Sequence, residues 1–196
     1  MSRYILALLL YSISIIAYAE NEVAVFAGGC FWCMEGPFDK LDGVISTTSG
    51  YTGGHTENPT YEETSSGRTG HYEAVRIIYD STKVSYQKLL DVYWKNIDPF
   101  DARGQFCDKG PQYRAAIFAR NDEEKELANK SKAELQDKLK NKATIVTEIL
   151  PASVFYTAED YHQDYYINNS VRYKYYRYAC GRDKRLEQVE NIINPK

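Results

Sequence analysis

The sequence is poor in the residues that most often bind metal ions, and it carries no large excess of charge of either sign. It has three histidines and four cysteines among 196 residues, and its formal net charge is −3. The histidines do not stand at ligand spacing, and Cys107 and Cys180 form no second Cys-x-x-Cys pair, which argues against a zinc site. The near-neutral charge gives no electrostatic basis for binding nucleic acid. No repeat, low-complexity tract or interdomain linker interrupts the chain, so we expect one domain.

Long apolar runs are absent except near the first residues. Arg3 precedes an apolar run over residues 4–16, and Ala17-Tyr18-Ala19 follows it. A charged start, a short apolar stretch and a small-x-small motif are typical of a cleaved signal peptide. The run is shorter than the roughly 20 residues that a membrane-spanning helix needs. We therefore expect a signal peptide at 1–19 and a mature domain at 20–196, which would be periplasmic or otherwise extracytoplasmic and have no membrane anchor.

One cysteine lies at an expected junction between a strand and a helix. The apolar run Val23–Ala27 predicts a buried β-strand, Gly28-Gly29 breaks it, and Cys30 follows at the start of a helix towards Leu41. The N–H groups and the macrodipole of a helix N-terminus favour negative charge. We therefore expect a lowered pKa for Cys30 and a nucleophilic thiolate. A buried structural cysteine is the alternative.

Strand and helix patterns alternate along the rest of the chain. Strands are expected at 44–49, 73–79, 113–119 and 145–150, and helices at 85–96 and 122–140, with Ser85 and Asn121 as N-caps. The segment after residue 159 is rich in Tyr, Lys and Arg and is expected to include a final helix at 185–193. Alternation of strands and helices predicts an α/β fold, although it does not give the strand order.

Several motifs resemble the peptide methionine sulfoxide reductases of the A type. The motifs stand in the family's order at Gly29–Trp32, Gly50–Gly54, Asn58–Tyr61, Gly70–Val75 and Gln112–Arg114. The resemblance covers the chain from about Val23 to Cys180. It implies one α/β domain, a plait with a mixed central sheet and packed helices, around which a long coil-rich C-terminal tail wraps.

The resemblance also implies an activity, the reduction of the S epimer of methionine sulfoxide, free or in proteins, to methionine. Cys30 would attack the sulfur, and Glu73 would protonate the oxygen, because oxide is a very poor leaving group. To act as an acid near neutral pH, Glu73 should have a pKa raised by burial. The other implied residues bind the oxygen, shape the site or hold the S-methyl group, and they are Tyr61 and Tyr113, Asp108, and Phe31 and Trp32. Taken singly, tyrosines are more often packing residues, and His162 receives no role.

Two positions depart from the common family pattern and bear on how Cys30 is recycled. Many members have glycine where this chain has Cys33, and Tyr178–Asp183 replaces a glycine-rich tail that carries a recycling cysteine. A second cysteine would condense with the Cys30 sulfenic acid, and an external dithiol such as thioredoxin would reduce the disulfide. We expect Cys180 to resolve the sulfenic acid, with Cys107 and Cys33 as alternatives. No metal or organic cofactor is called for, and we expect a monomer.

Two other functions remain open. Cys30-x-x-Cys33 fits a general thiol–disulfide oxidoreductase, which does not need Glu73 and the two tyrosines to converge. Four cysteines in an exported protein also fit a binding or structural domain with two disulfides and no free thiol.

Overall fold

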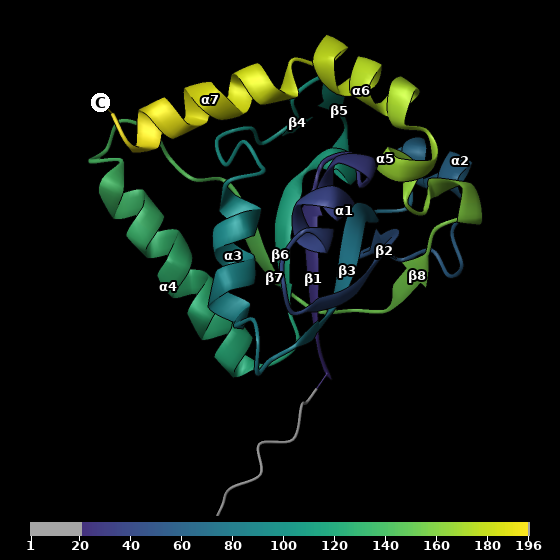
Figure 1. The fold of residues 1–196 in the computed structure, drawn as a ribbon, viewed down its shortest axis with the longest axis horizontal. Helices are drawn as coiled ribbons and strands as arrows, with labels where there is room; N and C mark the ends of the chain where they lie inside the picture. Colours follow the sequence, from purple (N-terminus) through teal and green to yellow (C-terminus); the bar gives the residue numbers. More distant parts are fainter. Residues whose placement is uncertain (1–20, 196) are drawn as a thin grey trace, which may run out of the picture.

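A six-stranded mixed sheet forms the centre of the computed structural model, which describes residues 21–195 (Figure 1). Its strand order is β7-β6-β1-β3-β2-β8, with β6 and β7 parallel and every other neighbouring pair antiparallel. The strands are β1 (Asn21–Gly28), β2 (Val44–Thr52), β3 (Tyr72–Asp80), β6 (Ala115–Ala119), β7 (Glu148–Pro151) and β8 (Phe155–Thr157). β4 (Gly104–Gln105) and β5 (Asp108–Lys109) form a separate hairpin. The expected α/β class with a mixed central sheet is confirmed.

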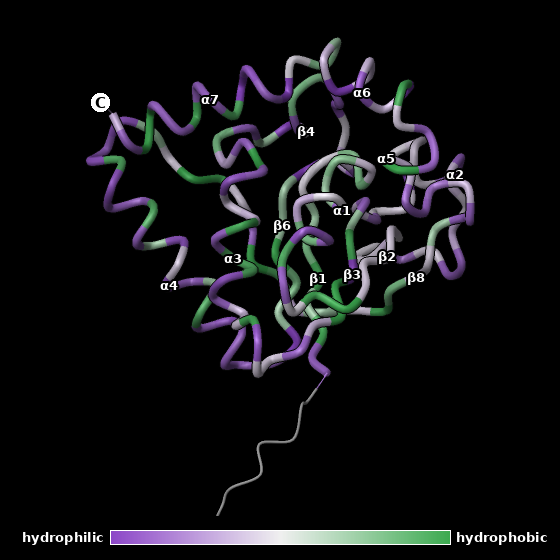
Figure 2. The backbone as a smooth tube through the Cα atoms, viewed as in Figure 1, coloured by the Kyte–Doolittle hydropathy of each residue, from purple (hydrophilic) through white to green (hydrophobic). Residues whose placement is uncertain are grey.

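Helices surround this sheet, and most of the hydrophobic core lies on one of its faces. The helices are α1 (Trp32–Asp39), α2 (Tyr61–Ser65), α3 (Tyr86–Trp94), α4 (Asp122–Lys138), α5 (Tyr165–Asn168), α6 (Ser170–Ala179) and α7 (Arg182–Ile193). The ring of Phe26 in β1 lies 5.6 Å from that of Phe38 in α1 and 5.1 Å from that of Tyr93 in α3. A smaller cluster that includes Phe118 and Tyr72 lies on the opposite face. In Figure 2 the central strands are largely hydrophobic, whereas α4 and α7 mix hydrophilic and hydrophobic residues.

Two helices begin at the capping residues that the sequence indicates. The side chain of Ser85 accepts a hydrogen bond from the N–H of Lys88 at the start of α3. The side chain of Asn121 accepts one from the N–H of Glu124 at the start of α4. Each bond satisfies a backbone donor that the helix itself leaves unpaired. Both expected N-caps are therefore confirmed.

Several strand boundaries differ from those expected. β2 continues through Gly50–Thr52, past the expected end of the strand at residue 49, because these residues pair with both β3 and β8. β8 itself was not expected. Tyr113 lies in a short 3-10 turn before β6, and β7 begins at Glu148 rather than at residue 145. Each difference arises from tertiary pairing, which local composition does not report.

The C-terminal segment is helical, so the expectation of a coil-rich tail was wrong. α5, α6 and α7 occupy most of residues 165–193, and the helix expected at 185–193 is the later part of α7. α6 has no buried residue, and α7 buries Arg182, Val189 and Ile193. Because tyrosines and charged groups make most of the contacts of these helices, hydrophobic spacing is a weak signal for them.

None of the helices within residues 21–195 is both long enough and apolar enough to cross a membrane. The signal peptide expected at residues 1–19 lies outside the described residues.

Candidate active site

Cys30 lies in the turn between β1 and α1, where the backbone closely approaches a neighbouring loop. Gly29 has a φ of +83°, and a Cβ atom there would lie 2.6 Å from the Cβ of Gln105, so the position requires glycine. The carbonyl of Cys30 accepts a hydrogen bond from the N–H of Cys33 at 3.0 Å. The side chain of Cys30 is 7% exposed. The expected strand–turn–helix setting is therefore confirmed.

Glu73 is buried beside this turn, near the start of β3. Its Oε2 accepts a hydrogen bond from the backbone N–H of Phe31 at 3.1 Å. Burial raises the pKa of Glu73 to about 8, although the Phe31 hydrogen bond works in the opposite direction. The negative charge of Asp108 adds to the rise. The expected elevation of this pKa is confirmed, and the carboxyl is predominantly protonated at pH 7.

The pKa of Cys30 is raised, so the lowering that we expected at a helix N-terminus was wrong. Burial is the largest cause, and a hydrogen bond with Cys33 and the charge of Glu73 add to it. The pKa of Cys33 is lowered instead, chiefly because its sulfur accepts the hydrogen bond from Cys30. The positive charges of Arg182 and Arg177 favour the same thiolate against the cost of burial. The first proton therefore leaves from the pair with the negative charge on Cys33.

The side chains expected from the sequence converge on a cavity of about 70 Å³. It is lined by Cys30, Phe31, Trp32, Tyr61, Glu73, Asp108, Tyr113 and Tyr176. All of these except Tyr176 are residues that the sequence predicts for the site. Cys33, Cys107 and Cys180 do not line the cavity. Its volume is far below the roughly 300–1,000 Å³ of pockets for drug-sized ligands, so it suits a small polar group with a short apolar arm.

Two tyrosine hydroxyls meet at the polar side of this cavity. Burial raises the pKa values of Tyr61 and Tyr113, and a hydrogen bond joins their side chains. Both hydroxyls therefore stay protonated and are able to donate. Glu159 positions Tyr61, because its Oε1 accepts the N–H of Tyr61 and its Oε2 accepts the hydroxyl of Tyr51, each at 2.8 Å. This role of Glu159 had no signal in the local sequence.

Trp32 forms an apolar wall that other aromatic rings hold in place. Its ring stacks on Tyr165 with the centroids 3.7 Å apart and the planes 7° from parallel, and Tyr176 meets it edge-on. The Nε1–H of Trp32 donates to Nδ1 of His162 at 3.0 Å. Burial lowers the pKa of His162, whose ring also lies 4.9 Å from that of Phe31. His162 is thus a structural support for the wall.

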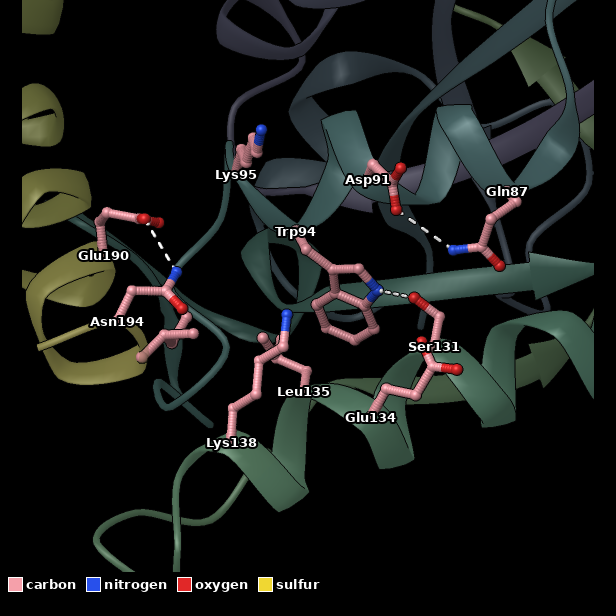
Figure 3. A pocket seen from close by; sticks show the side chains of 11 residues that line it. Gln87, Asp91, Trp94, Lys95, Ser131, Glu134, Leu135, Lys138, Glu190 and Asn194 are labelled. Carbon is pink, nitrogen blue, oxygen red and sulfur yellow. Dashed lines mark hydrogen bonds between the residues drawn. The ribbon is translucent and has the colours of Figure 1, made fainter.

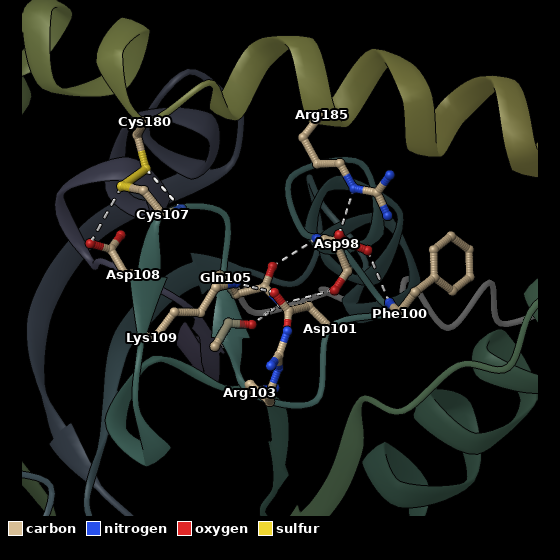
Figure 4. A network of polar contacts seen from close by, with 11 residues as sticks. Asp98, Phe100, Asp101, Arg103, Gln105, Cys107, Asp108, Lys109, Cys180 and Arg185 are labelled. Carbon is tan, nitrogen blue, oxygen red and sulfur yellow. Dashed lines mark hydrogen bonds and ion pairs between the residues drawn. A yellow bond between two sulfur atoms is a disulfide. The ribbon is translucent and has the colours of Figure 1, made fainter.

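Asp108 connects the cavity to a disulfide at the protein surface (Figure 4). One carboxylate oxygen of Asp108 accepts the hydroxyl of Tyr176 from α6. The preceding residue, Cys107, is bonded to Cys180 at the end of α6, with 5.0 Å between the Cα atoms. Although Cys107, Asp108 and Cys180 bring possible metal-ligand atoms within 4.8 Å of one another, the two sulfurs are already bonded to each other.

Cys30 and Cys33 are free thiols, in contrast to this surface pair. A domain held together by two structural disulfides would leave no free thiol. The arrangement of one disulfide and one dithiol therefore does not fit that alternative.

Arg182, in the first turn of α7, places a buried positive charge where it acts on Cys33. Its side chain is 1% exposed, and it donates to the carbonyl oxygens of Gly28 at 3.1 Å and Asn96 at 2.7 Å. Its guanidinium also lies 4.2 Å from the ring centroid of Phe106. The sequence analysis predicts no role for Arg182. The one sequence feature that points to it is its position in the tail that departs from the common family pattern.

A larger cavity of about 300 Å³ lies between α3, α4 and α7 (Figure 3). One wall is Trp94, whose Nε1–H donates to Oγ of Ser131 at 2.8 Å. No cysteine or histidine is among the residues that line it. It therefore offers no group for thiol chemistry, and the smaller cavity at Cys30 is the candidate active site.

The cavity places a thiol beside a protonated carboxyl and two hydroxyl donors, and a second thiol is hydrogen-bonded to the first. This arrangement defines a thiol-dependent oxidoreductase. The family model described as peptide methionine sulfoxide reductase matches residues 22–192. The chain therefore belongs to the peptide methionine sulfoxide reductase family and is an enzyme of that family.

Individual relatives agree with this assignment. The chain is similar to peptide methionine sulfoxide reductase MsrA of Bacillus subtilis, with 55% identity over 163 residues, which cover 83% of this chain and 92% of that protein. The Bacillus licheniformis protein of the same name is 53% identical over 169 residues, covering 86% of this chain and 93% of that protein. Among solved structures, reduced Mxr1 from Saccharomyces cerevisiae matches with a TM-score of 0.72 and 34% identity, covering 78% of this chain and 87% of that one. Methionine sulfoxide reductase A of Corynebacterium diphtheriae matches with a TM-score of 0.69 and 34% identity, covering 79% and 77%.

Proposed function

We propose that this enzyme reduces the S epimer of methionine sulfoxide, free or in oxidised proteins, to methionine, and so repairs oxidative damage. One observation carries the proposal: the free thiol of Cys30 and the protonated carboxyl of Glu73 line the same small cavity. Reduction of a sulfoxide needs both groups, because the oxygen must be protonated while the sulfur is attacked. General thiol–disulfide exchange requires no such acid.

The first chemical step transfers the oxygen atom to Cys30. The Cys30 sulfur attacks the substrate sulfur while Glu73 gives its proton to the sulfoxide oxygen, and the thiol proton of Cys30 returns to the Glu73 carboxylate. The sulfur–oxygen bond of the substrate then breaks as the hydroxyl group bonds to the Cys30 sulfur. The transient sulfur–sulfur bond breaks with its electron pair leaving on methionine, so Cys30 becomes a sulfenic acid. The hydroxyls of Tyr61 and Tyr113 donate hydrogen bonds to the oxygen as its negative charge develops.

The apolar wall selects the substrate by its methyl group. We assign Phe31 and Trp32 to the S-methyl group, because both line the cavity and the ring of Trp32 is held by stacking on Tyr165. Asp108 shapes the same cavity through its hydrogen bond with Tyr176. A fixed wall opposite fixed oxygen donors distinguishes the two epimers, because exchange of the methyl group and the oxygen would leave the donors unpaired.

Cys33 is best placed to form the first disulfide with Cys30. The sequence favours Cys180 for this step, but in the structure Cys180 is bonded to Cys107, whereas Cys33 is hydrogen-bonded to Cys30. The lowered pKa of Cys33 also supplies the attacking thiolate. We propose that Cys33 displaces water from the Cys30 sulfenic acid and that Cys107 and Cys180 act later.

A dithiol protein of the thioredoxin type is proposed as the external reductant. Each cycle leaves one disulfide, and a dithiol returns the two electrons by thiol–disulfide exchange. The proposed cycle uses no metal or organic cofactor, no nucleic acid partner, and a single copy of the chain.

We also propose that the enzyme is exported. The charged start, the apolar run and the small-x-small motif within residues 1–19 support this proposal. Cell fractionation and N-terminal sequencing test it, and we expect a mature protein outside the cytoplasm that starts near Glu20. Full-length protein that retains Met1 in the cytoplasm would contradict it.

The reaction itself is tested with purified enzyme, dithiothreitol and the two epimers of methionine sulfoxide, free and in a peptide. We expect methionine to form from the S epimer alone. Equal turnover of both epimers would contradict the proposed specificity. Reduction of insulin disulfides without reduction of either sulfoxide would instead establish general thiol–disulfide oxidoreductase activity.

A further inference from the structure

A stripe of largely exposed apolar side chains runs along α6 and begins in the preceding helix α5. Val171, Tyr175 and Tyr178 are 82%, 73% and 85% exposed, and their spacing places them on one face of the helix. Ile167, one turn earlier in α5, is 58% exposed. We call these four residues the α6 stripe. Contiguous exposed apolar side chains often mark a protein–protein interaction site, and aromatic residues in particular are enriched at protein interfaces.

The α6 stripe ends beside the surface disulfide. Cys180 is the C-cap residue of α6 and follows Tyr178 by two positions, and its partner Cys107 is exposed. Figure 1 shows α6 at the rim of the molecule, and Figure 4 shows the disulfide between the end of α6 and β5. A reducible bond and an exposed aromatic surface thus lie next to each other.

The catalytic dithiol is too deeply buried for the short cysteine side chain of a protein reductant, although the longer methionine sulfoxide side chain fits the cavity. Cys30 is 7% exposed and Cys33 is 1% exposed, and the cavity at Cys30 has a volume of only about 70 Å³. A protein reductant must bring its own sulfur into contact with the sulfur it attacks. The disulfide between Cys107 and Cys180 meets that requirement, whereas the pair of Cys30 and Cys33 does not.

We propose that the α6 stripe is the docking surface for the dithiol protein that reduces this enzyme, and that the reductant attacks the disulfide between Cys107 and Cys180. The inference rests on the proposed function and adds to it the surface and the bond at which electrons enter.

The charges around the α6 stripe define the partner further. Arg172, Lys174 and Lys184 are exposed, and none of them forms an ion pair with another residue of the part that the structure describes. Unpaired cations around an apolar centre favour a partner with an apolar surface at its cysteines and acidic groups at its rim.

The exchange steps balance in atoms and electrons. A thiolate of the reductant attacks one sulfur of the bond between Cys107 and Cys180, which releases the other sulfur as a thiolate and forms a mixed disulfide. The second thiol of the reductant breaks that mixed disulfide, so the reductant leaves as a disulfide and Cys107 and Cys180 become a dithiol. This dithiol then reduces the disulfide of Cys30 and Cys33 by the same exchange, with Cys33 as the better leaving group because its pKa is lowered.

The docking surface is tested with the double variant Tyr175→Ser/Tyr178→Ser and bacterial thioredoxin as the probe. We expect the KM for thioredoxin to rise about tenfold or more, because exposed tyrosines are common interface anchors, while turnover with dithiothreitol stays unchanged. Ile45→Ser removes a side chain of similar exposure (54%) at the start of β2, and it should alter neither rate. An unchanged KM for thioredoxin in the double variant overturns the proposal.

The disulfide that the reductant attacks is identified by trapping the mixed disulfide. Thioredoxin whose second active-site cysteine is replaced by serine should form a stable mixed disulfide at Cys107 or Cys180, and peptide mapping identifies the site. A mixed disulfide at Cys30 or Cys33 overturns the proposal, as does a dimer of this chain that the double Tyr→Ser variant dissociates. Turnover of wild-type enzyme with dithiothreitol is the independent readout, because its absence would refute the proposed function and not the docking surface.

Discussion

The backbone N–H of Phe31 donates a hydrogen bond to Oε2 of Glu73 at 3.1 Å, across 42 positions of sequence. This bond joins the turn that carries Cys30 to the strand that carries the acid. The carbonyl oxygen of a protonated carboxyl is a better acceptor than its hydroxyl oxygen, so this bond favours the proton on Oε1. The contact therefore positions the carboxyl beside Cys30 and favours donation from Oε1.

Replacement of Glu73 by glutamine should remove the acid and keep the shape. In Glu73→Gln, the side-chain oxygen still accepts the Phe31 N–H, but no acidic proton is available. We expect kcat for methionine sulfoxide to fall by roughly 10²–10⁴-fold, with little change in KM. In wild type, activity should decline as pH rises through about 8, where Glu73 loses its proton. Steady-state rates from pH 6 to 10 measure both effects, and a variant as fast as wild type at pH 7 would remove Glu73 from the mechanism.

The raised pKa of Glu73 also predicts a change in stability with pH. Because the pKa is about 8 in the folded protein and about 4.5 in the unfolded chain, the folded state binds the proton more tightly. This contribution to stability is complete below pH 4.5 and is lost as pH rises through 8, and it amounts to at most about 5 kcal/mol. Glutamine does not titrate, so the stability of Glu73→Gln should not fall in this way as pH rises. Urea unfolding at pH 9 should therefore give a higher free energy of unfolding for the variant than for wild type. Parallel stability curves for the two proteins between pH 5 and 9 would show that Glu73 does not titrate as described.

The tyrosine pair should act on the transition state and not on folding. Tyr113→Phe and Tyr61→Phe each remove one hydroxyl donor to the developing oxyanion, and each should lower kcat about 10²-fold with little effect on KM. Because the two side chains are hydrogen-bonded to each other, the fold-decrease in kcat of the double variant should be smaller than the product of the two single-variant decreases. A rise in KM at constant kcat would show that these hydroxyls bind the ground state instead.

Arg182 should control the thiolate of Cys33. In Arg182→Met, the loss of the buried charge should raise the pKa of Cys33, and thiolate absorbance at 240 nm against pH measures the shift. The variant should also be less stable by about 1–3 kcal/mol for each carbonyl left unpaired, at Gly28 and Asn96. Arg185→Met is the matched control on α7, because Arg185 pairs with Asp98 and is not among the groups that shift the pKa of Cys33. Equal thiolate curves for the two variants would contradict the assignment.

Local signals in the sequence explain what could be predicted. Three of the correct predictions rest on short-range features. They are the strand that ends at Gly28-Gly29, the N-caps Ser85 and Asn121, and the position of Glu73 at the start of an expected strand. The raised pKa of Glu73 was expected from the acid role that the family resemblance implies, and the burial of Glu73 in β3 causes it.

Long-range packing explains what was missed. Arg182 and Tyr176 reach the site from the C-terminal helices, and Arg182 contacts Gly28 across 154 positions. The expected lowering of the Cys30 pKa was wrong, because burial and the hydrogen bond with Cys33 outweigh the effect of the helix N-terminus. Such contacts depend on how α6 and α7 pack along the rim of the domain, which periodicity does not determine (Figure 1).

The chemistry at Cys30 is tested most directly in a single turnover without reductant. In the triple variant Cys33→Ser/Cys107→Ser/Cys180→Ser, Cys30 is the only cysteine left, so its oxidised form cannot be resolved. With the S epimer of methionine sulfoxide, we expect one equivalent of methionine per enzyme and a sulfenic acid on Cys30, which dimedone labelling and mass spectrometry detect. Cys30→Ser in the otherwise wild-type chain should form no methionine. Methionine from the Cys30→Ser variant, or a full equivalent from the triple variant with Cys30 unmodified, would contradict attack by Cys30.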